Sequence, residues 1–197
     1  MDQHFQARIN AMLELASRQF SIGAMEALDS FEYPLLKNKV VGARLNTIQN
    51  DFQPCTDTMN TAVALAFREV LLNRIRFISP THILFGMLTV ANSVAFQVLS
   101  DFKDAYHRTI ADLYNRMEVA ENEMKLSSIH QLQLGMEISP MISRTRQLIS
   151  GRKDIKLSTG HVLLSFYDDS TSHELLLFAP DRKEIEDRVF GEVFLEE

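Results

Sequence analysis

The sequence is poor in residues that interrupt or cross-link a chain. Its 197 residues include 7 glycines, 5 prolines, one cysteine and no tryptophan. Because glycine and proline mark turns and end helices, their scarcity favours long helices over many short strands. The single cysteine, Cys55, excludes an internal disulfide and a metal site built from several cysteines, and a lone cysteine is typical of a reducing compartment.

An excess of positive charge and long apolar runs are also lacking. The formal net charge is −6, and no basic stripe is present, so a nucleic acid is a poor partner. No run approaches the roughly 18 consecutive apolar residues of a membrane-spanning helix. The start, Met1-Asp2-Gln3-His4, has neither the basic nor the apolar region of a signal peptide. These absences predict a soluble cytoplasmic protein without a membrane partner.

Recognisable catalytic motifs are missing as well. There is no phosphate-binding Gly-x-x-x-x-Gly-Lys-Ser/Thr loop, so we expect no ATP hydrolysis by that machinery, and we predict no cofactor and no metal. The pair His173-Glu174 begins a zinc-protease pattern, but Leu177 occupies the position of the second histidine. An enzyme would need an uncharted site around His82, His161 or Cys55, and that alternative stays open.

The residues that are present predict a globular helical protein, with 46% apolar and 23% charged residues. Apolar residues recur at helical spacing over 4–29, and a second apolar segment covers 35–48. The segment 50–54 is typical of a turn or linker. We therefore predict an N-terminal helical extension over 1–54 and a main helical domain over 55–197.

The main domain begins with the most regular helical pattern of the chain. Its apolar positions follow the i, i+3, i+4, i+7 rule, and Thr56 or Asp57 can cap the helix. Ser79-Pro80 opens the next helix, with serine as N-cap and proline at the first helical position. A short helix follows over 94–99. The spacing then predicts a long helix that begins near residue 103 and carries an apolar seam of Tyr106, Ile110, Leu113, Met117 and Ala120.

That seam has two interpretations. Its alternating spacing resembles a heptad, so it could form an intermolecular coiled coil. Packing onto the chain's own domain is the favoured alternative. The second half of the chain then repeats the first: Ser139-Pro140 again marks a helix start, and the segment 157–164 echoes 78–85, with His82 and His161 lying 79 positions apart. The expected architecture is all-α, with two four-helix repeats related by pseudo-twofold symmetry, the first over about 55–126 and the second over about 136–195.

Residues 56–88 resemble the first repeat of the N-terminal domain of Clp AAA+ unfoldases. That repeat begins with a threonine, passes through an Ala-rich helix and reaches an Ile-Gly-Thr-Glu-His-Leu-Leu motif. Here these parts are Thr56, Ala64-Leu65-Ala66 and the run 78–84. The second motif copy is 157–163, and the resemblance covers roughly 55–195. It implies a bundle of about eight helices that recruits substrates or adaptor proteins.

The resemblance also implies roles for individual residues. The family's recognition positions fall on Thr81 and Gly160, which replace the usual glutamate before each motif histidine, and its opening threonine falls on Thr56. The acidic position helps to bind phosphoarginine in some family members, so its double loss argues against that ligand. The remaining motif residues, Ser79, Pro80, His82 and His161, are predicted to be structural, with each histidine anchoring the first turn of its helix. The first helix of the second repeat is predicted to be one turn shorter than that of the first.

The predicted function is a non-enzymatic protein-binding module that recruits a substrate or adaptor for a AAA+ unfoldase or protease. Its partner would be a protein or peptide, such as a Clp ATPase, a protease subunit or a substrate. The chain could instead be the N-terminal part of a longer Clp-type ATPase, including the type that dismantles secretion sheaths. A third alternative is a purely structural homodimer through 1–54 or the seam at 106–120.

Overall fold

The computed structural model describes residues 39–119, 128–150, 156–168, 174–176 and 179–192, and within these ranges the chain is almost entirely helical. The helix predicted over 4–29 lies outside the described residues. The all-α prediction is confirmed. The α-helices are α3 (Lys39–Asn50), α4 (Asp57–Leu72), α5 (Pro80–Thr89), α6 (Val94–Ser100), α7 (Lys103–Val119), α8 (Ile138–Ile149), α9 (Thr159–Tyr167) and α11 (Arg182–Glu192). Two 3₁₀ turns, η3 (Ile129–Gln131) and η4 (Glu174–Leu176), and two short strands, β1 (Phe77–Ile78) and β2 (Gln133–Leu134), complete the described elements.

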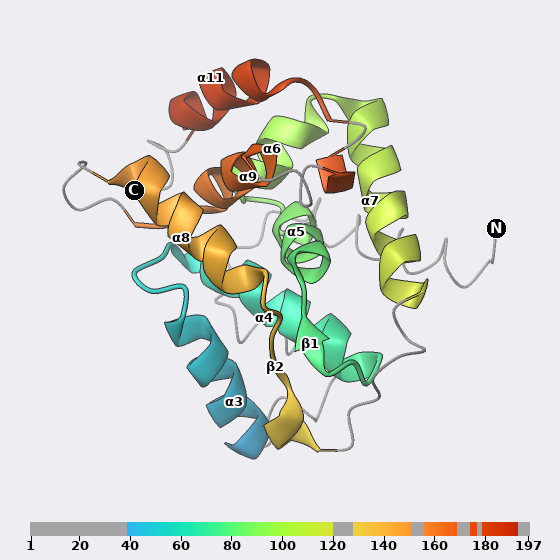
Figure 1. The fold of residues 1–197 in the computed structure, drawn as a ribbon. Helices are drawn as coiled ribbons and strands as arrows, with labels where there is room; N and C mark the ends of the chain where they lie inside the picture. The colour runs from blue at the N-terminus through green and yellow to red at the C-terminus, as the bar shows by residue number, and fades with distance from the viewer. Residues whose placement is uncertain (1–38, 120–127, 151–155, 169–173, 177–178, 193–197) are drawn as a thin grey trace.

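The elements form the two predicted repeats. The first consists of α4, α5, α6 and α7, and the second of α8, α9, η4 and α11. In Figure 1, α4 and α5 lie at the centre, with α7 on one side, α8 and α9 on the other, and α11 across the top. The predicted one-turn difference is confirmed, because α4 has 16 residues and α8 has 12. The third segment is the seven-residue helix α6 in the first repeat, and the described part of its counterpart is the 3₁₀ turn η4.

Two strand-like contacts link the repeats in a reciprocal way. Cys55 forms a parallel bridge with Leu157, and Ile78 pairs in parallel with Leu134. Adding 79 to the numbers of Cys55 and Ile78 gives Leu134 and Leu157, so each contact is the other with the repeats exchanged. The hydrogen bonds follow the same rule: Thr56 N donates to Leu157 O at 3.0 Å, and Gly135 N donates to Ile78 O at 2.8 Å. This exchange is what a pseudo-twofold axis between the repeats produces.

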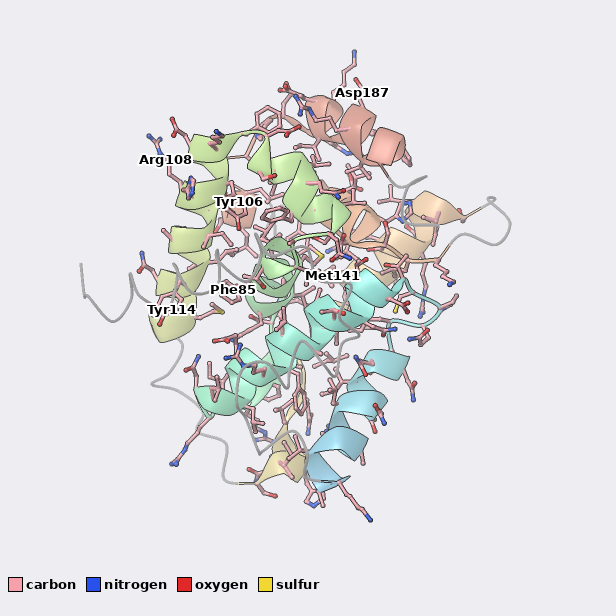
Figure 2. All side chains as sticks on the ribbon, turned by 180° about the vertical axis from the view of Figure 1, so that it is seen from behind. Phe85, Tyr106, Arg108, Tyr114, Met141 and Asp187 are labelled. Carbon is pink, nitrogen blue, oxygen red and sulfur yellow. The ribbon has the colours of Figure 1, made fainter. Side chains whose placement is uncertain are left out.

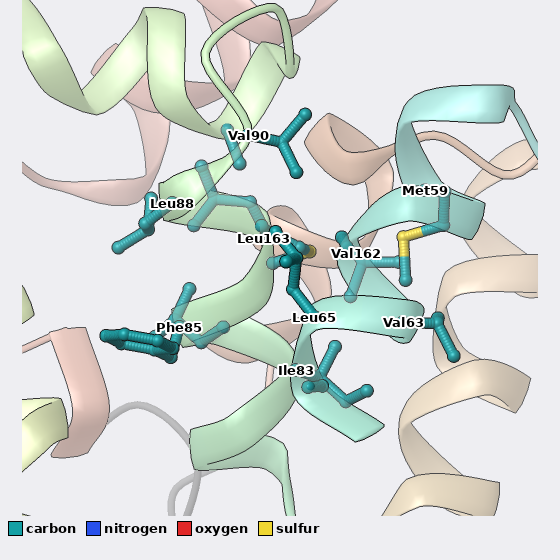
Figure 3. Close-up of a cluster of buried hydrophobic side chains, with 14 of the residues drawn as sticks. Met59, Val63, Leu65, Ile83, Phe85, Leu88, Val90, Val162 and Leu163 are labelled. Atoms are coloured by element: carbon teal, nitrogen blue, oxygen red, sulfur yellow. The ribbon is translucent and has the colours of Figure 1, made fainter. Parts of the chain in front are cut away.

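One hydrophobic core spans both repeats. Figure 3 shows Leu65 from α4, Ile83 from α5 and Leu163 from α9 pointing toward a common centre. Ile83 and Leu163 are completely buried, and Leu65 is 9% exposed. Because side chains of both repeats fill the same interior, each repeat completes the core of the other.

Helices α4 and α5 approach each other closely at Gly86. Gly86 faces the backbone of α4, and a Cβ atom built on it would lie 2.2 Å from the carbonyl oxygen of Ala62. Ala62, Ala64 and Ala66 are completely buried. Small residues on both helices therefore allow the two backbones to approach each other.

The seam on α7 packs onto the chain itself, as the favoured interpretation expected. Tyr106, Ile110, Leu113 and Met117 are each at most 6% exposed, and α7 contacts α5, α6 and η4. In Figure 2, Phe85 and Tyr106 lie between α5 and α7. The Tyr106 hydroxyl donates to Leu88 O at 3.0 Å and so satisfies a carbonyl at the end of α5. The seam is thus covered within one chain. Residue Ala120 lies outside the described residues.

The start of α8 corrects one detail of the prediction. The helix begins at Ile138, so Ser139 and Pro140 are its second and third residues rather than its cap and first residue. Proline is tolerated there because the first-turn N–H groups of a helix have no intrahelical partner. Glu137 precedes the helix and makes no side-chain capping bond.

No single helix among the described residues is long and apolar enough to cross a membrane. The consecutive helices α5 and α6 together have the length and apolar composition of a membrane-spanning segment, but they are bent by 77° at the break between them. Most residues of both helices are buried in the protein core.

Helix α4 ends in a Schellman motif whose left-handed residue is Arg74, with φ of 55°. Ile75 N donates to Val70 O at 2.8 Å, and Arg74 N donates to Leu71 O at 3.3 Å. Glycine is the usual residue at this position, since a Cβ atom makes left-handed backbone costly.

We expect Arg74→Gly to raise the free energy of unfolding by up to about 1 kcal/mol, because the strain of the left-handed residue is removed. Urea denaturation of the full chain measures the change. Arg74→Ala is the matched control: it removes the same exposed side chain but keeps Cβ, and it should leave stability nearly unchanged. An equal gain from both variants would assign the effect to the arginine side chain instead of the backbone.

Candidate protein-binding site

The helices α5 and α9 begin in the same way, at the two copies of the sequence motif. Ser79 precedes α5, and its backbone N–H donates to Nδ1 of His82 at 3.2 Å. Ser158 precedes α9, and its N–H donates to Nδ1 of His161 at 3.3 Å. The serine hydroxyls lie 2.7 and 2.9 Å from the same ring nitrogens. Both helix starts are capping boxes in which histidine takes the place of the usual Glu or Gln.

Through these contacts each motif serine and histidine bond to each other within the first turn of their helix. His82 is 2% exposed and His161 is completely buried, and Pro80 occupies the first position of α5. Burial lowers the pKa of His82 to about 4, because an imidazolium would lose its hydration there. Nδ1 accepts a backbone hydrogen bond, so the neutral ring carries its proton on Nε2. A buried ring that stays neutral and bonds to its own cap serves structure.

Thr56, the first candidate for partner binding, is the N-cap of α4. Its hydroxyl accepts a hydrogen bond from Met59 N at 3.3 Å and lies 2.9 Å from the hydroxyl of Thr58. The side chain is 9% exposed. Of the two cap residues that the sequence allowed, the structure selects Thr56, and this structural role explains the opening threonine of the motif.

The other two candidates differ in their surroundings. Thr81 is half-buried in the first turn of α5. Gly160 is buried in α9, and a Cβ atom there would lie 2.7 Å from Val94 and 2.8 Å from Val189. The absence of a side chain thus allows α6 and α11 to pack over the start of α9. A partner cannot reach Gly160 while these two helices remain in place, so of the two equivalent positions only Thr81 is presented toward the surface.

The start of α9 also joins the two repeats. The Thr159 hydroxyl accepts a hydrogen bond from Ala95 N at 3.3 Å, which connects α9 to the first turn of α6. In the first repeat, Pro80 occupies the equivalent position and has no such oxygen. Sequence reasoning missed this contact, because a single threonine hydroxyl gives no periodic signal.

The arrangement offers little for metal or nucleophilic chemistry. No group of three or more histidine, cysteine, aspartate or glutamate side chains gathers at one place in the part of the chain that the structure describes. The Cys55 thiol is mostly buried, and burial together with the nearby Asp57 raises its pKa to about 11. Its Sγ lies 3.2 Å from Oδ1 of Asn60. A thiol in this state is a poor nucleophile at neutral pH.

The comparison with protein families agrees with this geometry. The sequence model of the Clp repeat (R) N-terminal domain matches residues 55–178, more than half of the chain, and spans both capping boxes. The chain belongs to this family. No curated protein shows a significant match to the chain.

Membership of the Clp repeat N-terminal family confirms the resemblance drawn from the two motif copies. Such a domain is a Clp-type N-terminal module that is itself non-catalytic, and domains of this family generally bind protein partners or substrates. The match begins at residue 55, directly after the predicted linker. Helix α3 lies before the matched residues, and α11, the last helix of the second repeat, lies after them.

Proposed function

We propose that the chain is a non-enzymatic cytoplasmic module that recruits a substrate or adaptor protein to a AAA+ unfoldase. The family match over 55–178 carries the proposal, since this domain type generally binds proteins. Two further features support it. The motif histidines act as helix caps, and the single thiol has a raised pKa, so none of the three residues considered for an enzymatic site is poised for chemistry.

Two arrangements fit this function. The chain acts either as a separate accessory protein or as the N-terminal module of a longer Clp-type ATPase, including the sheath-dismantling type. The length of the open reading frame distinguishes them, because the second requires ATPase domains after residue 197. Two surfaces were considered for a structural homodimer, and one of them, the α7 seam, is buried within the chain.

An affinity pull-down from the native lysate, with the tagged chain as bait and mass spectrometry as readout, tests recruitment. We expect a Clp ATPase, a protease subunit or an unfoldase substrate to be enriched. Thr81→Arg should reduce that enrichment by at least about tenfold, the loss that corresponds to 1.4 kcal/mol of binding free energy.

Asn92→Arg is the matched control for this experiment. It adds the same side chain at an exposed position in the turn between α5 and α6, and it should leave the enrichment unchanged. Recovery of the bait alone contradicts recruitment and favours the homodimer. An equal loss from both variants indicates a general charge effect and removes Thr81 from the site.

A further inference from the structure

Helix α3 docks on the family domain with one apolar face. Val41, Leu45 and Ile48 follow the i, i+4, i+7 spacing and are 6%, 3% and 2% exposed. Phe52, in the following turn, is completely buried. The helix contacts α4 and η3, which belong to the first repeat and to the segment before the second. We call this surface of α4 and η3 the α3 seat.

Polar contacts hold this helix at two points and the turn after it at a third. The Arg44 guanidinium donates to Leu132 O, with Nε at 2.7 Å. The Gln49 side chain donates to Asn60 O at 3.0 Å. Arg146 of α8 donates to Asp51 O and Gln53 O, both at 3.0 Å. Each contact uses a backbone carbonyl, so another helix of the same register can replace α3 without unpairing a buried charge.

The sequence of α3 is poorly suited to an independent helix. Gly42 lies in its interior, and a Cβ atom there would meet nothing within 4 Å, so no close packing requires the glycine. The first turn has no acidic residue and the last turn has no basic residue. The helix has 12 residues, about the length at which isolated helices are marginal even for favourable sequences. Docking therefore holds α3 in place, and we expect α3 to detach at a lower free energy than the central helices.

We infer that α3 occupies in cis the site where a partner's amphipathic helix binds. The inference rests on the proposed recruitment function and names the surface and the partner chemistry. The α3 seat lies within the matched family domain, whereas its occupant lies outside that domain. Detachment of α3 exposes the apolar surface that now covers Val41, Leu45 and Ile48.

The side chains of α3 define the partner. It is an amphipathic helix with apolar residues at i, i+4 and i+7 and an arginine at i+3, in the places of Val41, Leu45, Ile48 and Arg44. This is helix-in-groove recognition, in which apolar anchors supply affinity and a guanidinium fixes the register. Because α3 competes from the same chain, the partner binds with its intrinsic affinity multiplied by the open fraction.

A fluorescent peptide with the sequence of residues 38–53 serves as the partner, and anisotropy reports its binding to the full chain. Leu45→Asp in the chain weakens the hold of α3, and we expect the peptide to bind at least about tenfold more tightly than to wild type. Gly42→Ala strengthens α3 as a helix, and we expect binding about fivefold weaker. A peptide that itself carries Leu45→Asp is the negative control and should not bind.

Equal binding to all three chains, or no binding to the Leu45→Asp chain, overturns the inference. Should Leu45→Asp fail to fold by circular dichroism, Arg44→Ala replaces it, and the Arg44→Ala and Gly42→Ala chains must shift the affinity in opposite directions. This binding experiment uses only the chain and the peptide, without any protein from the lysate. Failure here together with a successful pull-down therefore rejects the α3 seat alone, whereas the opposite pair of results rejects recruitment alone.

Discussion

Gly86→Ala is expected to lower the free energy of unfolding by about 3 kcal/mol, at the upper end of the range for overpacking a core. The added methyl group would lie 2.2 Å from Ala62 O and 3.3 Å from Ala66 N, both backbone atoms of α4. Side-chain rotation cannot relieve such a clash, so α5 must move away from α4. The gain of about 1 kcal/mol in helix propensity only partly offsets the loss. Thermal and urea denaturation measure the change.

Two other helical glycines provide matched controls for the same substitution. At Gly160 the close atoms are methyl groups of Val94 and Val189, which can shift, so Gly160→Ala should cost clearly less than Gly86→Ala. At Gly42 nothing lies within 4 Å, and the alanine should stabilise the chain by up to about 1 kcal/mol. We expect Gly42→Ala to be the most stable of the three variants, Gly160→Ala to be intermediate and Gly86→Ala to be the least stable. A stability for Gly86→Ala equal to that of Gly160→Ala would contradict a backbone clash.

Acidification is expected to destabilise the chain through His82, by up to about 3 kcal/mol. Its pKa is about 4 in the folded protein and 6.5 as a free side chain, so the unfolded chain binds the proton more readily. The stability contributed by the neutral ring is therefore complete above pH 6.5 and falls as the pH drops from 6.5 toward 4. His82→Gln removes this dependence. Glutamine preserves a capping-box acceptor at the same helix position, although the loss of the buried ring lowers stability at every pH.

The measurement is the free energy of unfolding at several pH values between 4.5 and 7.5. His82→Gln should give a flatter profile than wild type, and His130→Gln, at an exposed histidine of η3, should give the wild-type slope. The comparison uses slopes, so a constant loss from the missing ring does not affect it. Parallel profiles for wild type and His82→Gln would show that the pKa of this histidine is the same in the folded and the unfolded protein.

Local patterns in the sequence predicted the parts of the fold that depend on neighbouring residues. Ser79-Pro80 marked the start of α5, the pair Thr56 and Asp57 marked the cap of α4, and the segment 94–99 formed α6 with one further residue. Each signal lies within one or two helical turns. The repeat was also visible, because both copies of the motif place Ser and His three residues apart, where their capping bonds form.

Contacts between distant residues could not be predicted in this way. Arg44 reaches a carbonyl 88 positions away, and Arg146 reaches carbonyls 95 and 93 positions away. An arginine that faces solvent and an arginine that binds a distant carbonyl have the same local sequence pattern. Periodicity therefore does not distinguish them. Gly160 was identified by its motif position, but its burial depends on Val94 and Val189, which come from two other helices. The domain boundary near 50–54 stays a prediction, and the described part of the extension, α3, packs into the same core as the main domain.

The reciprocal contacts between Cys55 and Leu157 and between Ile78 and Leu134 give the chain the layout of a homodimer fused into one polypeptide. In a true homodimer, one gene position determines both symmetry-related sites, and every substitution acts twice. Fusion removes that constraint. Gly86 lies against α4, while its counterpart Ser165 keeps a side chain whose hydroxyl donates to Val162 O at 2.7 Å. Thr81 and Gly160 have separated in the same manner, one toward the surface and the other beneath α6 and α11. The duplicated motif thus supplies two copies of one position that have diverged independently, one toward the surface and the other into the packing between helices.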